Sequence, residues 1–227
     1  MIKLYRFDYS PFVRKVQMVL DLIGTEYEAV DVPYGDRTEL VELTGGYVQV
    51  PVLLADGEVI TDSRNICRWL VGRPSGRWLV PADRAGAVWA YADWCDGPLE
   101  DVMFRIATPQ IARRFARPAD RAMFTFIKER KYGAGCVGQW EREHEALTRK
   151  AAELLEPTLQ TLRSQAFVFG SEPTLADAAL FGQFAMLETA DPRLPAKLAE
   201  AIVPWMKKLE RWRRPGARAG RAARKGG

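Results

Sequence analysis

The first third of the chain alternates between strand-like and helix-like hydrophobic patterns. Apolar and polar side chains alternate from Ile2 to Phe7, which predicts a strand with one buried face. From Pro11 onward, apolar residues recur every three or four positions, which predicts a helix that ends near Gly24. By the same patterns we expect further strands at 27–32, 48–54 and 59–61, and further helices at 38–43 and from 62.

This order, β-α-β-α-β-β-α, predicts a small mixed sheet with helices on its faces. A helix joins the first two strands, so they should be parallel, whereas a tight turn at Asp56-Gly57 should make the last two an antiparallel hairpin. Pro51 lies inside the strand-like run 48–54, although proline is poorly tolerated within a central strand. We therefore expect a strand that begins at a special bond before Pro51, for which a cis peptide is the candidate.

From Pro81 onward the chain shows no strand alternation, which predicts an all-helical second part. The expected helices are 82–106, 118–131, 139–163, 174–188 and 195–213. The chain then divides into an α/β domain at 1–75, a helical domain at 82–212 and a basic, disordered tail at 213–227. In the fourth helix, Thr174 and Asp177 can cap the first turn, and apolar residues follow on all sides. That pattern predicts a buried central helix and a structural role for Asp177.

The junction between the first strand and the first helix carries candidate chemistry. Ser10 is a good N-cap, and Pro11 suits the first helical position, where no backbone hydrogen bond is lost. A helix N-terminus also offers unpaired N–H donors and about half a positive charge, which can stabilise an anion such as a thiolate. Ser10 is therefore either only a cap or also a catalytic group. Asp62-Ser63 at the start of a later helix presents the same alternative.

Composition and charge indicate a packed globular protein. Hydrophobic residues make up 48% of the 227 residues, and no apolar run approaches the length needed to cross a membrane. The N-terminus starts directly with the strand pattern and has no signal-peptide layout, so we expect a cytoplasmic location. The net charge of +4 comes from segment 213–227, which holds six basic residues and no acid. Nucleic-acid binding is not favoured, because aromatic residues do not interleave with these charges, and it stays an alternative confined to the tail.

The cysteines and the histidine do not form a metal-binding or disulfide pattern. Cys67, Cys95 and Cys136 are widely spaced and form no CxxC motif. We interpret them as reduced packing residues and expect no metal site. The single histidine, His144, lies among charged residues, which predicts a solvated position on the surface.

Four segments, in this order and at these spacings, resemble the glutathione S-transferase family. They are SPFVRKV at 10–16, QVPVL at 49–53, DS at 62–63 and FGSEPTLAD at 169–177. With the βαβαββα half and the helical half, the resemblance covers about residues 1–210. It implies a thioredoxin-like N-terminal domain, a helical-bundle C-terminal domain and a homodimer, with glutathione as the co-substrate.

The resemblance also implies a role for each matched residue. Ser10 stands where serine-type members place the hydroxyl group that hydrogen-bonds the glutathione sulfur. Val50, with the cis proline Pro51 after it, offers its backbone to the cysteinyl part, and Gln49 reaches the glycyl end. Asp62-Ser63 holds the amino and carboxylate groups of the γ-glutamyl part.

Aromatic residues near these segments are candidates for the site of the second, electrophilic substrate. Phe12 follows Ser10 on the first helix, and Phe104 lies on the first long helix of the second part. Tyr9 is a third candidate for this site, and it also competes with Ser10 for the sulfur role, in which Ser10 is favoured. The electrophile itself is not predicted from the sequence.

The favoured function is a glutathione transferase in which Ser10 stabilises the thiolate for attack on a small electrophile, by conjugation or isomerisation. Serine stands at position 10, where omega-like and glutaredoxin-like relatives have cysteine, which argues against disulfide exchange. The loop Thr44–Val48 differs from the Asn-Pro-x-Gly pattern that is usual in the family. That difference leaves one alternative open, a non-catalytic binding or stress-associated protein with the same fold.

Overall fold

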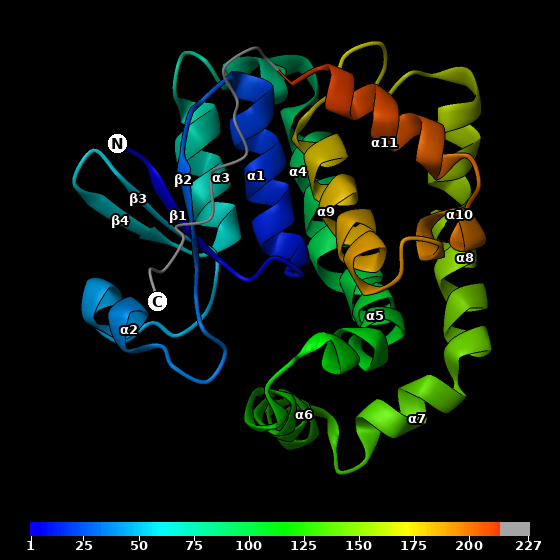
Figure 1. The fold of residues 1–227 in the computed structure, drawn as a ribbon. Coiled ribbons are helices and arrows are strands. Elements are labelled where there is room, and N and C mark those ends of the chain that lie inside the picture. The colour runs from blue at the N-terminus through cyan, green and yellow to red at the C-terminus, as the bar shows by residue number, and fades with distance from the viewer. Residues whose placement is uncertain (214–227) are drawn as a thin grey trace.

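Among residues 1–213, which the structure describes, the N-terminal part forms a four-stranded mixed sheet (Figure 1). The structure is a computed structural model. The strands, in the order β2-β1-β3-β4, are β1 (Lys3–Arg6), β2 (Glu28–Asp31), β3 (Val52–Ala55) and β4 (Glu58–Thr61). β1 pairs in parallel with β2 and antiparallel with β3, and β3 and β4 form a hairpin. The predicted sheet is confirmed, and β3 begins directly after Pro51.

Helices cover both faces of this sheet. They are α1 (Pro11–Ile23), α2 (Thr38–Thr44) and α3 (Ser63–Gly72). α1 and α3 lie side by side between the sheet and the helical part of the molecule, and their core includes Leu4 and Leu53 of the sheet (Figure 1). α2 belongs to a separate cluster in which Leu40 packs with Tyr5 and Val52. The alternation of side chains along β1 therefore serves two cores, one on each face.

The rest of the described chain is helical. It contains α4 (Ala85–Trp94), α5 (Glu100–Arg114), α6 (Pro118–Tyr132), α7 (Cys136–Arg142), α8 (His144–Ser164), α9 (Leu175–Ala190), α10 (Leu194–Leu198) and α11 (Ile202–Arg211). Short 3-10 turns precede α4, and a π-helical turn, Cys95–Leu99, joins α4 to α5. The thioredoxin-like part followed by a helical part is the predicted fold class, and it is confirmed.

Three predicted helix boundaries are wrong. The helix expected to end near Ile106 continues through Pro109 to Arg114, because the buried side chains around the proline offset its missing N–H group. The helix predicted at 139–163 is divided at Glu143 into α7 and α8. The helix predicted at 195–213 is divided where Ala199 adopts an extended backbone. In both divided helices the two pieces pack in different directions, which hydrophobic periodicity does not report.

α9 is the central helix of the molecule. Its residues are buried from Leu175 to Leu187, and it packs against α1, α4 and α5. Its first turn is a capping box formed by Thr174 and Asp177. The fully buried Asp177 carboxylate accepts hydrogen bonds from the backbone N–H groups of Val168 and Thr174, both at 2.9 Å, and from Trp205 Nε1 at 3.3 Å. The predicted structural role of Asp177 is confirmed.

The backbones of α1 and α9 are in close contact at Gly182. A Cβ atom on this residue would lie 2.4 Å from the carbonyl oxygen of Pro11 and 3.0 Å from the backbone nitrogen of Lys15. Only glycine allows the two backbones to come so close. The contact fixes the first turn of α1, directly after Ser10, against the core of the helical part.

We expect Gly182→Ala to lower the free energy of unfolding by about 1–3 kcal/mol, because the added methyl group must push α1 away from α9. Gly86→Ala in α4 is the matched control, since a Cβ atom there meets nothing within 4 Å. Gly86→Ala should leave the free energy of unfolding unchanged or raise it slightly. Urea unfolding of both variants measures the difference. Equal stability of Gly182→Ala and the wild type would contradict the close contact.

The end of the described chain contacts α1. Arg213 Nε lies 3.1 Å from a carboxylate oxygen of Asp21, and burial raises the pKa of Asp21 to about 6. Residues 214–227 of the predicted basic tail lie outside the described residues. Within residues 1–213, the helices are all too short or too polar to cross a membrane.

Candidate functional site

Ser10 lies at the N-terminus of α1 as its N-cap. Its Oγ accepts a hydrogen bond of 3.4 Å from the backbone N–H of Val13, and its own backbone is extended. Pro11 occupies the first turn, as predicted. A hydroxyl that caps a helix uses only its oxygen as acceptor, so its hydrogen can still be donated to a second group. The two interpretations of Ser10, cap and anion-binding group, are therefore compatible in one geometry.

Tyr9, the neighbour of Ser10, is part of an aromatic wall. Its ring stacks on Phe7 at 5.5 Å between centroids and meets Phe124 edge-on at 5.9 Å. Its hydroxyl is buried without a hydrogen-bond partner in the part of the chain that the structure describes, and burial raises its pKa. A hydroxyl group that is enclosed by protein in this way is not exposed to a ligand in the cavity. The geometry thus favours Ser10 over Tyr9 for the sulfur role.

Two adjoining cavities meet at Phe12, Gln49 and Val50. The first, which we call the α3 cavity, has a volume of about 340 Å³ and contains Asp62 and Ser63. The second, the aromatic cavity, has a volume of about 390 Å³ and contains Ser10. Both cavities adjoin the Val50–Pro51 peptide bond, which is cis, as predicted. The residues predicted for glutathione thus gather along one continuous depression.

The start of α3 forms one side of the α3 cavity. Asp62 caps the helix, and one of its carboxylate oxygens accepts hydrogen bonds from the backbone N–H groups of Arg64 (2.8 Å) and Asn65 (3.3 Å). The Ser63 hydroxyl is buried and accepts a hydrogen bond of 3.0 Å from Lys15 Nζ. Arg64 forms an ion pair with Asp93 across the cavity. Positive and negative groups thus stand side by side where an amino acid zwitterion would fit.

Lys15 is a buried cation that the sequence analysis missed. Its ammonium group donates to Ser63 and also forms an ion pair with Asp96, so that it joins α1, α3 and the π-helical turn. Burial raises the pKa of Asp96, although the Lys15 charge acts in the opposite direction. One signal could have found this residue. Lys15 shares a helical ridge with Met18 and Leu22, which are fully buried.

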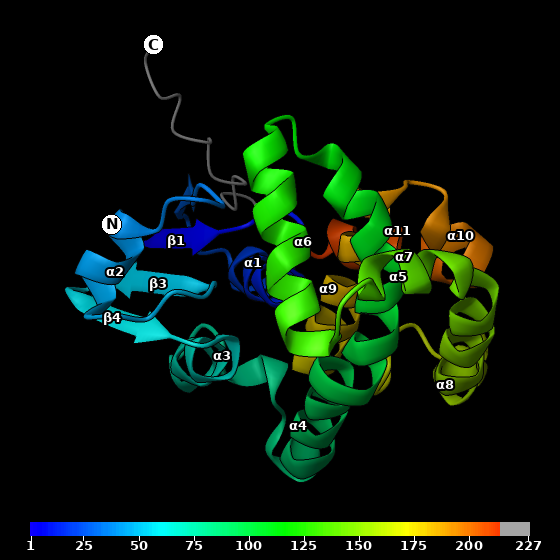
Figure 2. The same cartoon turned by 90° about the horizontal axis from the view of Figure 1, so that it is seen from below.

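The aromatic cavity brings Phe12 and Phe104 together with Ser10, as predicted for a second-substrate site. Its walls come from the segment between β1 and α1, from the segments before α2 and β3, and from α1, α5, α6 and α9. Figure 2 shows α6 in front of α1. α6 is held there by Phe124, which is fully buried against the rings of Tyr34 (5.5 Å) and Phe115 (5.1 Å).

Charged residues of the aromatic cavity were also missed from the sequence. Arg37, Lys128 and Lys131 line it together with the carboxyl group of Glu100. Burial lowers the pKa of Lys128 to about 8 and raises that of Glu100 to about 7. These residues come from three separate segments, so no local pattern in the sequence connects them.

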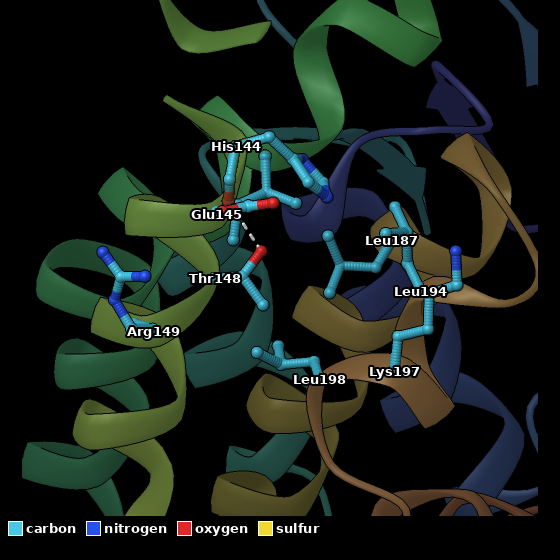
Figure 3. Close-up of a pocket in the computed structure, with 9 residues that line it drawn as sticks. His144, Glu145, Thr148, Arg149, Leu187, Leu194, Lys197 and Leu198 are labelled. Carbon is cyan, nitrogen blue, oxygen red and sulfur yellow. Dashed lines mark hydrogen bonds between the residues drawn. The ribbon is translucent and has the colours of Figure 1, made fainter. Parts of the chain in front are cut away.

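His144, which was expected at the surface among charged residues, lies at the edge of a third cavity. It is half-buried at the start of α8 and lines this cavity of about 320 Å³, with Leu187 and Leu194 as part of its apolar floor (Figure 3). His144 is thus only partly solvated, because α10 packs close to this end of α8 and α9. The third cavity shares no lining residue with the two cavities at Ser10.

The cysteines are all free and buried, in agreement with a packing role. Burial raises the pKa of Cys67 to about 11, so its thiol is protonated at neutral pH. Among residues 1–213, no group of histidine, cysteine and acidic side chains is arranged to hold a metal ion. None of the three cysteines lines either of the two cavities at Ser10.

The fold and the site together define a class of protein, a thioredoxin-like domain joined to a helical domain with a capped serine beside a cis-proline loop. Family models agree with this class. Residues 4–78 match the model described as glutathione S-transferase, N-terminal domain, and residues 139–214 match that of the C-terminal domain. The chain belongs to the glutathione S-transferase family.

Individual relatives are distant. The chain is 26% identical to glutathione S-transferase U1 of Arabidopsis thaliana over 60% of its own length and 63% of the relative's length. It is 30% identical to a probable glutathione S-transferase of Nicotiana tabacum over 36% of its own length and 37% of the relative's length. The matched segments thus span less than two thirds of these curated relatives. A solved glutathione S-transferase of Ceriporiopsis subvermispora in complex with glutathione has a similar fold, with a TM-score of 0.76 and 17% sequence identity. The match covers 93% of this chain and 96% of the solved chain.

We expect Lys15→Met to lower the free energy of unfolding by about 3 kcal/mol, because it leaves the Asp96 carboxylate without its buried partner. Adding Asp96→Asn should restore part of this loss. Lys3→Met is the control, since Lys3 pairs with Glu28 at the surface and should cost less than about 1 kcal/mol. Urea unfolding tests the difference. Equal effects at positions 3 and 15 would count against a buried ion pair.

Proposed function

We propose that this protein is a glutathione transferase that binds glutathione, stabilises its thiolate and directs it at a small electrophile. The observation that carries the proposal is the position of Ser10. Its hydroxyl lies at the N-terminus of α1, where the aromatic cavity reaches the cis Val50–Pro51 bond. Family membership supports glutathione transfer in general.

The energetic demand on Ser10 is modest. A free thiol has a pKa of about 8.5, and lowering it by about two units requires about 2.7 kcal/mol of stabilisation of the anion. A hydrogen bond to a charged group supplies about 1.5–3 kcal/mol, and a helix N-terminus adds about 0.3–1 kcal/mol. The Ser10 hydroxyl and the first turn of α1 can therefore together supply the stabilisation that the thiolate requires.

With the sulfur placed at Ser10, the positions of the other parts of glutathione can be assigned. The backbone of Val50 receives the cysteinyl part, and the α3 cavity receives the γ-glutamyl part beside Asp62 and Ser63. Gln49 lines both cavities and is the contact for the glycyl end. The loop before it is ordered, since Thr44 Oγ1 accepts a hydrogen bond of 2.9 Å from the backbone N–H of Tyr47.

The electrophile enters the aromatic cavity, where Phe12 and Phe104 form apolar walls next to Ser10. Conjugation or isomerisation then depends on the bond that the thiolate attacks. The assembly we propose is a homodimer, and the location is the cytoplasm.

Ser10→Ala should reduce kcat/KM for glutathione conjugation by about 10- to 100-fold, because the thiolate loses one charged hydrogen bond. The pKa of bound glutathione, followed by the ultraviolet absorbance of the thiolate, should rise by about one to two units. Ser10→Thr keeps both the hydroxyl and the cap and is the control.

Unchanged activity in Ser10→Ala would remove Ser10 from the mechanism. Calorimetry separates that result from the alternative function. If the wild type fails to bind glutathione at millimolar concentration, the non-catalytic binding protein becomes the better description.

A further inference from the structure

The aromatic cavity carries an excess of positive charge that thiolate stabilisation does not use. Three cations line it, Arg37, Lys128 and Lys131, and Glu100 is the single acid among its described lining residues. A cavity built only for an apolar electrophile would not need these groups. Their presence points to a negative charge on the molecule that enters.

Lys128 is the most informative of the three cations. Its Nζ lies 4.6 Å from the ring centroid of Phe124 and 5.0 Å from that of Phe104. Within residues 1–213 its ammonium group forms neither a hydrogen bond nor an ion pair. A half-buried ammonium group without a carboxylate partner is costly, and two ring contacts offset only part of that cost. Lys128 is therefore prepared to receive an anion.

The surroundings of Lys128 strengthen this point. Desolvation and the nearby charge of Lys131 both lower its pKa, whereas Glu100 acts in the opposite direction. Glu100 does not neutralise it fully, because burial raises the pKa of that carboxyl group to about 7. Arg37 is already engaged with the carbonyl oxygen of Val48 and lies over the rings of Phe7 and Tyr34. Lys131 is engaged with Tyr132, whose ring centroid lies 4.9 Å from its Nζ. Lys128 is thus the cation left for a ligand.

We propose that the second substrate is an aromatic electrophile that carries a carboxylate group. The carboxylate meets Lys128, with Lys131 beside it, and the ring lies against Phe104 and Phe12 with its reactive carbon toward Ser10. The cavity volume of about 390 Å³ is within the range of small-molecule sites. This proposal rests on the transferase function proposed above and specifies its substrate class.

A suitable probe is 4-chloro-3-nitrobenzoate, with its methyl ester as the neutral partner. The thiolate sulfur forms a bond to the ring carbon that carries chlorine, the C–Cl bond breaks, and chloride leaves with the electron pair. The thiol proton passes to water. Because the two compounds differ in reactivity, each enzymatic rate is divided by its rate with glutathione alone.

We expect Lys128→Met to reduce the acid-to-ester ratio of kcat/KM by about 10- to 100-fold, through loss of the charged contact to the carboxylate. Lys150→Met on α8 is the control, since this exposed lysine lines none of the three cavities and should leave the ratio unchanged. An equal loss for acid and ester would overturn the proposal. The proposal would also be overturned if Lys128→Met raised the KM for glutathione without changing the acid-to-ester ratio, because Lys128 would then bind a carboxylate of glutathione.

Calorimetric binding of 4-nitrobenzoate separates this proposal from the transferase function, since this compound has no leaving group. If 4-nitrobenzoate binds to the wild type but not to Lys128→Met, and neither chlorinated probe is turned over, the cavity is specific for aromatic carboxylates but the protein is not a transferase for them. If 4-chloro-3-nitrobenzoate and its methyl ester are turned over equally well, and 4-nitrobenzoate does not bind, the preference for a carboxylate is overturned while the transferase function is kept.

The affinity for 4-nitrobenzoate should fall as the pH rises from about 6 to 9. At the lower pH, Glu100 is neutral and Lys128 is charged, with Arg37 and Lys131 as the other basic residues of the cavity. At the higher pH, Glu100 is ionised and Lys128 has lost its proton. Glu100→Gln should weaken this dependence, and affinity that rises with pH would contradict the assignment.

Discussion

The close contact between α1 and α9 is the constraint on which the site depends. Gly182 lets the backbone of α9 touch the first turn of α1, so the N-terminus of α1 cannot move independently of the helical core. A helix N-terminus stabilises an anion only where its N–H groups point, and a small displacement would lose that interaction. The packing of two helices far apart in sequence thus determines where Ser10 presents its hydroxyl group.

Two lysines show how burial changes the use of a charge. Lys15 is enclosed with Asp96 and Ser63, so its charge is used internally to hold α1, α3 and the π-helical turn together. Lys128 is enclosed by rings and has no carboxylate bonded to it among the described residues, so its charge is available. The first stabilises the scaffold around the α3 cavity, and the second gives the aromatic cavity a preference for anions.

Much of the fold could be predicted, because it depends on local patterns. Alternation and helical spacing found the strands and the helices of the first 72 residues, and the proline at position 51 indicated the cis bond that the structure contains. The helix boundaries at Arg114, Glu143 and Ala199 were missed, since each is decided by packing against distant elements.

The sequence by itself determined the order of the elements, the cap at Ser10 and the buried role of Asp177, because capping and periodicity involve residues a few positions apart. Only the tertiary structure decided which charges are buried and which cavity each residue faces. Lys128 and Glu100 lie far apart in the chain and meet only when α5 and α6 pack. Their pKa values and their chemistry come from that enclosure, which no local segment encodes.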